Sequence, residues 1–335
     1  MPAQTRTVSS IFFNMEKLLL RQTPRLAQAL LGIRWSFAWP KPSIRRELIE
    51  YSFPLGPVPF EDDLLSQTGV RLISHNEDKD SVRRHLALGR DTIIAVDSFL
   101  LPYRPAFGRV HSHRTLIVRA CDKPGEVWVD DAWPPSFQGA LSWTVIENAR
   151  YSPVTLDPGR EPIFAGRPIN GEWFSVDLDW FPILDAADWA TRLLQRIFLR
   201  ANTITADERG EYGLTAMKSF IRELTVAAGG SPSERFRFFR EASLLLRTEL
   251  SARVYFCALL RAASVWLKDP QLKLEANEYY SSLRHMESAR DVLTKSLRQF
   301  RAVYSDYLLA CLRLSLAAEE RLGTYLSRYS TGFTN

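Results

Sequence analysis

Cysteine is scarce in this chain, and its scarcity excludes two classes of protein. The 335 residues contain three cysteines, Cys121, Cys257 and Cys311, which are far apart and odd in number. A disulfide-stapled secreted domain needs paired cysteines in a short chain, and a structural zinc site needs closely spaced ligands. Because neither pattern is present, we predict free thiols and a reducing, cytoplasmic location.

Long apolar runs are missing as well. No apolar stretch approaches the roughly 20 residues that a membrane-spanning helix needs, and the N-terminal residues lack the pattern of a secretory signal. Hydrophobic residues make up 46% of the chain and charged residues 24%, as in ordinary globular proteins. We therefore predict no membrane partner, and two domains or one extended domain at this length.

A net acidic charge is also absent, since the chain carries a formal charge of +5 at pH 7. Residues 233–335 account for an equivalent excess, with 16 Lys and Arg against 11 Asp and Glu. These basic residues recur at helical spacing, without the motifs of nucleic-acid-binding domains, so no nucleic-acid partner is expected. The face is either simply solvated or a docking surface for an acidic protein.

What the chain does contain is a chemically rich stretch, residues 91–132. Three short apolar runs in it, 92–96, 115–118 and 127–129, are bounded by turn formers or charges. Such punctuation predicts strands rather than helices. From residue 185 onward the pattern is helical, and residues 151–182, rich in Pro, Gly and Asp, are predicted to link the two halves, with short extended pieces such as a strand over 172–176.

Two histidines and two aspartates border these strands. His111 and His113 precede the second strand, and the third ends at Asp130 and Asp131. A His that opens one antiparallel strand and an Asp that closes the next are expected to lie side by side, as the base and orienter of a catalytic triad. The two aspartates point to opposite faces of a strand, so only one of them can orient an imidazole.

Two other interpretations of the histidines are open. At two residues' spacing both point to one face of an extended chain, where Asp130 or Asp131 could join them around a metal ion. The sequence offers no further ligand cluster, so no metal and no other cofactor is predicted. A pair of hydrogen-bonded turn histidines is the structural alternative.

The same stretch resembles a known family. Residues 94–103 read IAVDSFLLPY, and the hairpin after them carries His113, Asp122 and the run 127–131. This pattern resembles the N-terminal domain of butirosin-biosynthesis-H-type proteins, with its motifs V-G-V-D-x-F-x-L-P-Y and H-x-x-V-V-x-G-Y-D-D…V-Y-V-x-D-P. Ala120-Cys121 stand where the family has G-Y, and Ala132 or Trp133 where it has the final Pro.

The resemblance implies an α+β fold: a papain-like domain with an antiparallel sheet over residues 1–150, followed after the linker by an all-α domain or lid over 183–330. It also implies transfer of an acyl group from a carrier-protein thioester to an amine, in antibiotic or nonribosomal-peptide biosynthesis. The partners would then be an acyl or peptidyl carrier protein, which could dock on the basic helical face, and a small-molecule or peptidyl substrate.

In the family the catalytic residues are Cys, His and Asp. The register of the resemblance favours His113 as the base and Asp131 as its orienter, with Asp130 and His111 as alternatives. No cysteine lies near the N-terminus, and Ser10 stands at the position of the catalytic Cys.

Ser10 opens a predicted helix that reaches Leu20. It is either an activated nucleophile or a helix cap, and the abundance of serine at helix starts favours the cap. Gln4 lies six residues upstream, at the spacing of the oxyanion-hole Gln in papain-like enzymes.

Aromatic residues supply the candidate substrate-binding surface. Trp35, Phe37 and Trp39 alternate as in an extended segment, and Tyr103 closes the first family motif. The tryptophans either form a wall of the core or, with Tyr103, line a site for an acyl or peptide chain.

Two functions follow. The first is an acyltransferase, or a peptide-processing or cyclising enzyme. The second is a catalytically degenerate relative that binds a carrier protein or a biosynthetic partner.

Overall fold

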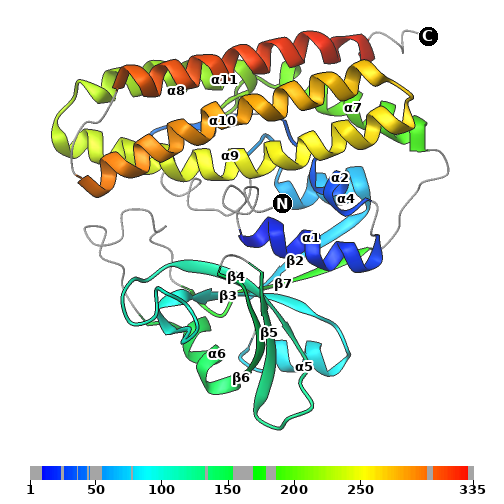
Figure 1. Ribbon diagram of the computed structural model, residues 1–335, viewed down its shortest axis with the longest axis vertical. Helices are drawn as coiled ribbons and strands as arrows, with labels where there is room; N and C mark the ends of the chain where they lie inside the picture. Colours follow the sequence, from blue (N-terminus) through cyan, green and yellow to red (C-terminus); the bar gives the residue numbers. More distant parts are fainter. Residues whose placement is uncertain are drawn as a thin grey trace. The chain divides into compact units, whose positions relative to one another are not determined.

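The computed structural model describes residues 10–23, 26–35, 37–43, 45, 55–76, 78–132, 135–153, 169–178, 186–299 and 305–330. The chain forms two compact units, and each unit is assembled from two separate parts of the sequence. Unit 1 comprises residues 1–27 and 70–180, and unit 2 comprises residues 28–69 and 181–335. Figure 1 labels the helices and strands of both.

Unit 1 is built on a six-stranded sheet with the strand order β2-β7-β3-β4-β5-β6, in which every neighbouring pair is antiparallel. The strands are β2 Val70–His75, β3 Thr92–Asp97, β4 His113–Arg119, β5 Glu126–Asp131, β6 Phe137–Ser142 and β7 Trp173–Leu178. The helices are α1 Ser10–Gln22, α5 Ser81–Ala87, α6 Trp143–Arg150 and the single 3-10 turn η2 Ser98–Leu100.

The two faces of this sheet are covered by different helices (Figure 1). On one face, strand residues such as Val96 and Leu116 form an apolar core with Leu86 of α5 and Ile146 of α6. Helix α1 contacts the other face, where Ser10 is hydrogen-bonded to Thr115 of β4. Because side chains alternate along a strand, each strand residue can be assigned to the α1 face or to the α5/α6 face.

The strands predicted at residues 92–96, 115–118 and 127–129 are confirmed as β3, β4 and β5. The strand predicted over 172–176 is present as β7, residues 173–178, but it lies in the interior of the sheet rather than in a linker between the two halves. Strand β7 pairs with β2 along its whole length, and Trp173 and Phe174 also pair with β3. Its buried apolar residues complete the core of unit 1.

Unit 2 is mainly helical. Its helices are α2 Ala27–Leu31, which begins at the last residue of unit 1, α4 Phe60–Thr68, α7 Ala186–Thr203, α8 Gly213–Ala228, α9 Pro232–Trp266, α10 Pro270–Gln299, α11 Ser305–Leu326 and the 3-10 turn η3 Ser327–Tyr329. A two-stranded antiparallel sheet joins β1 Ala38–Pro40 to β8 Gly210–Tyr212. Helix α9 starts with a capping box between Ser231 and Glu234, with Pro232 in the first turn.

Residues 28–69 belong to unit 2 rather than to the predicted domain over 1–150. Asp63 of α4 is buried and accepts hydrogen bonds from Arg34 and from Arg200 of α7. Strand β1 pairs with β8, and the aromatic side chains around it pack on α8 and α9. The boundary prediction failed because the contacts of Asp63 with Arg200 and of β1 with β8 join segments that are more than a hundred residues apart.

The predicted α+β class, with antiparallel strands and a helical C-terminal region, agrees with this architecture. Among the described residues, no helix has the length and apolar character needed to cross a membrane.

Candidate active site

The clearest catalytic arrangement in unit 1 is a His–Asp pair at the end of β3. Asp97, the last residue of that strand, is only 2% exposed. Its Oδ2 lies 2.6 Å from Nδ1 of His111, whose side chain is 14% exposed. An ionised carboxylate can only accept, so Nδ1–H donates, and Nε2 carries the lone pair of the neutral imidazole.

Several further donors fix the Asp97 carboxylate. Oδ1 accepts hydrogen bonds from the backbone N–H groups of Phe99 at 3.0 Å and Ser112 at 3.2 Å. Oδ2 also accepts one from the hydroxyl of Ser152 at 2.9 Å. The ring of Phe99 stacks on the imidazole of His111 with centroids 4.0 Å apart. The carboxylate and the imidazole are therefore both held in one orientation, as a base and its orienter must be.

His113, the predicted base, lies at the start of β4 directly opposite Asp97 in the β-ladder. Strand alternation places it on the α1 face together with Thr115, whose side chain meets Ser10. Arg114, between them, belongs to the α5/α6 face.

Asp131, the predicted orienter, lies on the α5/α6 face. It is buried and makes a two-point ion pair with Arg114, at 2.9 and 2.8 Å. Tyr103 donates its hydroxyl hydrogen to Asp131 at 3.1 Å, and burial together with the nearby carboxylate raises the pKa of that tyrosine. The register thus puts His113 and Asp131 on opposite faces, whereas His111 and Asp97 are in direct contact.

Asp130, the alternative orienter, does lie on the α1 face. It pairs in the ladder with Ile117, four residues along β4 from His113. Lys17 of α1 contacts Asp130 at 2.5 Å and Arg119 contacts it at 2.7 Å. Burial by itself would raise the pKa of Asp130, but the hydrogen bonds from Lys17, Arg119 and Gln138 together lower it. Its charge therefore helps to hold α1 on the sheet.

Ser10 is the first residue of α1 and links that helix to β4. Its Oγ accepts hydrogen bonds from the backbone N–H of Thr115 at 3.1 Å and from the Thr115 hydroxyl at 2.9 Å. Asn14, one helical turn later, donates to the same hydroxyl. This arrangement brings the predicted nucleophile to the same face of β4 as His113. Gln4, the predicted oxyanion-hole residue, lies outside the described residues.

The predicted substrate-binding tryptophans are both buried in unit 2. Trp35 stacks on Phe256 of α9, and Trp39 packs edge-on against Phe220 of α8. These contacts favour the interpretation of the tryptophans as a wall of the core. Tyr103 stacks on Phe137 in unit 1, next to the Asp131–Arg114 ion pair.

The sequence prediction missed Asp97 and Ser152. Asp97 lies inside the motif IAVDSF and ends a strand, which is a signal that could have marked it. Ser152 follows helix α6 without any recognisable pattern, and only the fold shows that it reaches Asp97.

Among the described residues, no three His, Cys, Asp or Glu side chains are grouped closely enough to bind a metal ion. No protein-family model matches the chain, and no curated protein matches its sequence.

Proposed function

We propose that this protein catalyses acyl transfer, with His111 as the general base and Asp97 as the residue that orients it. The observation that carries the proposal is the 2.6 Å contact between Nδ1 of His111 and the buried Asp97 carboxylate. Such a carboxylate fixes the imidazole tautomer and stabilises the imidazolium that forms when Nε2 takes up a proton.

The reaction is aminolysis of a thioester. The amine nitrogen attacks the carbonyl carbon, and Nε2 of His111 accepts the proton that this nitrogen loses. When the C–S bond breaks, the imidazolium returns the proton to the departing thiolate, so the products are an amide and a free thiol. In a covalent variant, the hydroxyl of Ser10 loses its proton to a base as it attacks the thioester carbonyl, and the C–S bond breaks to release the thiol. The amine then attacks the seryl ester, the C–O bond breaks, and the products are the amide and the free Ser10 hydroxyl.

The surroundings of His111 favour an apolar acyl group. The backbone N–H of Gly108 donates to the carbonyl of Phe99 at 2.9 Å, which holds the preceding loop beside the stacked pair of Phe99 and His111. Phe107 and Val110 in this loop are 50% and 47% exposed. Apolar side chains exposed beside a polar reacting group are typical of a small-molecule binding site.

The carrier-bound donor, the papain-like relationship and the role in antibiotic or peptide biosynthesis rest on the family resemblance described above. The basic helices of residues 233–335 would attract a carrier protein that has an acidic surface.

A second function is favoured by one specific observation. Asp97 also accepts the backbone N–H groups of Phe99 and Ser112, as aspartates that fix turns do. In this alternative the Asp97–His111 pair only holds the loop in place, and the protein binds a carrier or biosynthetic partner without catalysis.

The test uses hexanoyl-N-acetylcysteamine, a small thioester, with a primary amine as acceptor. We expect His111→Asn to lower the rate about 10²–10⁴-fold, while His285→Asn on α10 serves as a matched control that leaves it unchanged. Intact-protein mass spectrometry of wild type and Ser10→Ala identifies any seryl adduct. Equal rates in wild type and His111→Asn would contradict the general-base role, and hexanoyl binding without turnover would support the second function.

A further inference from the structure

The interior of unit 2 contains a cluster of charged side chains that none of the chemistry above uses. Glu249 and Arg253 lie one turn apart on α9, and Glu319 reaches them from α11. Nη1 of Arg253 is 2.5 Å from Glu249, and its Nε is 2.5 Å from Glu319. All three side chains are buried, and Glu249 is 0% exposed. Two carboxylates therefore share one guanidinium away from water.

The two carboxylates are not equally supplied with donors. Glu319 also accepts the hydroxyl hydrogen of Tyr279, from α10, at 2.7 Å. Glu249 accepts a backbone hydrogen bond from Ala38 of β1, but its Oε1 is buried without a hydrogen-bond partner in the described part of the chain. An ionised carboxylate with an unsatisfied buried oxygen is costly, and protonation removes that cost.

Arg34, in the segment before β1, is a second cation whose charge acts on Glu249. Its Nε and Nη2 both bind Asp63, at 3.1 and 2.8 Å, and Arg200 binds the same carboxylate, so the charge of Arg34 is only partly balanced there. The pKa of Glu249 is raised to about 7, mainly by burial and also by the charge of Glu319, while Arg253 opposes the shift. The direction of this shift agrees with the missing hydrogen-bond donor at Oε1 of Glu249 in the described part of the chain and with the neighbouring negative charge of Glu319.

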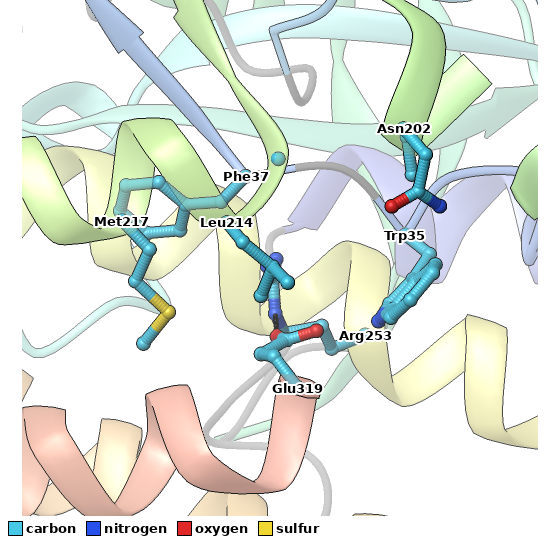
Figure 2. Close-up of a pocket in the computed structure, with 9 residues that line it drawn as sticks. Trp35, Phe37, Asn202, Leu214, Met217, Arg253 and Glu319 are labelled. Atoms are coloured by element: carbon cyan, nitrogen blue, oxygen red, sulfur yellow. Dashed lines mark hydrogen bonds and ion pairs between the residues drawn. The ribbon is translucent and has the colours of Figure 1, made fainter. Parts of the chain in front are cut away.

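A small pocket borders the same cluster (Figure 2). It has room for about one water molecule. Nη2 of Arg253 and the indole N–H of Trp35 are buried donors that find no partner among the residues that the structure describes, and both residues line the pocket. A water molecule in this pocket is a candidate hydrogen-bond partner for these donors.

We propose that protonation of Glu249 controls the stability of unit 2. When the proton is bound, the packing of α9, α10 and α11 against one another is stable, and release of the proton destabilises it; we call this a proton-dependent lock. The junction depends on the cluster because Arg253, Tyr279 and Glu319 come from three different helices and are joined to one another by hydrogen bonds. A second negative charge placed next to Glu319 repels it and draws Arg253 away from it.

The test compares the thermal midpoint Tm of the full chain from pH 4.5 to pH 8 in wild type, Glu249→Gln and Glu320→Gln. Glutamine imitates the protonated acid. We expect Tm of Glu249→Gln to exceed that of wild type by an amount that grows up to about pH 7 and is constant above it. Glu320 is an exposed neighbour on α11 paired with Lys218, and its variant should follow wild type. A difference in Tm between Glu249→Gln and wild type that does not change with pH would overturn the proposal.

If Glu249→Gln does not fold, a second variant still tests the proposal. In Glu319→Gln, Arg253 has a single carboxylate partner, so the pH-dependent loss of Tm should end at a lower pH than in wild type. Infrared difference spectra give an independent readout, since a buried protonated carboxylic acid has a carbonyl band that disappears as the pH rises through 7. Unchanged pH dependence in Glu319→Gln, or the absence of that band at pH 5.5, would contradict the lock.

Discussion

Unit 1 and unit 2 each bury a carboxylate beside a cationic or basic partner, but the two carboxylates differ in the hydrogen-bond donors that surround them. Asp97 in unit 1 accepts hydrogen bonds from an imidazole, a hydroxyl and two backbone N–H groups. Glu249 in unit 2 shares one guanidinium with a second carboxylate, and one of its oxygens has no hydrogen-bond partner among the described residues. A carboxylate surrounded by donors is suited to orienting a base, whereas one that lacks donors is suited to binding a proton itself.

The strongest test of this comparison removes the negative charge of Asp97 while keeping its shape. In Asp97→Asn the amide can present N–H rather than oxygen to His111, which favours the wrong tautomer. We expect the aminolysis rate to fall about 10³-fold or more, with secondary structure unchanged by circular dichroism. A variant with near wild-type turnover would show that Asp97 only fixes the loop.

In unit 2, Arg253→Met should cause the largest loss of stability. The substitution keeps an unbranched apolar stem but leaves two buried carboxylates without their cation, and we expect a loss of about 3–5 kcal/mol in urea unfolding at pH 7. Adding Glu249→Gln to Arg253→Met should restore part of that loss. If the double variant is no more stable than the single one, the two carboxylates do not compete for Arg253.

The pH dependence of wild-type stability gives the next effect. The folded pKa of Glu249 is raised from 4.5 to about 7, so its contribution to stability is complete below pH 4.5 and is lost as the pH rises to 7. A shift of this size corresponds to roughly 3 kcal/mol. Urea unfolding of wild type at pH 5 and pH 7.5, with Glu249→Gln as reference, measures this loss of stability. If the free energy of unfolding changes with pH equally in the two proteins, Glu249 does not bind the proton.

Ser10→Ala separates a structural from a covalent role for this serine. The variant leaves the Thr115 backbone N–H and hydroxyl without their acceptor, so we expect a loss of about 1–2 kcal/mol in stability. Under direct base catalysis the aminolysis rate should remain close to wild type. A loss of activity much greater than the loss of folded protein would instead identify Ser10 as the nucleophile.

The smallest structural effect is expected for Phe107→Ser. This ring is half exposed, so stability should change by no more than about 0.5 kcal/mol. Turnover of the hexanoyl thioester should fall, while that of the acetyl thioester should be unchanged. Equal effects on both substrates would show that the loop does not contact the acyl chain.

Features that depend on neighbours in sequence could be predicted from the sequence, and features that depend on chain topology could not. The strands around Ile94 and Leu116 follow from local apolar runs, and the start of α9 follows from Ser231, Pro232 and Glu234. Strand β7 could not be placed, because its position between β2 and β3 is set by residues about a hundred positions earlier.

The candidate site shows the same division. The sequence drew attention to the segment with His111 and His113 and to a carboxylate partner. Which histidine meets which aspartate depends on how the loop before β4 folds back on β3, and on the face to which each strand residue points. Neither is encoded in the spacing of His111, His113 and Asp131.

The exchange of segments between the two units affects how the chain must fold as it leaves the ribosome. Unit 1 cannot close its sheet until β7 has been synthesised, and Trp35, Phe37 and Trp39 must then still wait for α8 and α9. This aromatic segment therefore remains without its partners until α8 and α9 have been synthesised, and aggregation competes with folding during that interval. For the same reason, cutting the chain after residue 150 or 182 cannot yield two complete units, and circular permutants would be the better route to isolating them.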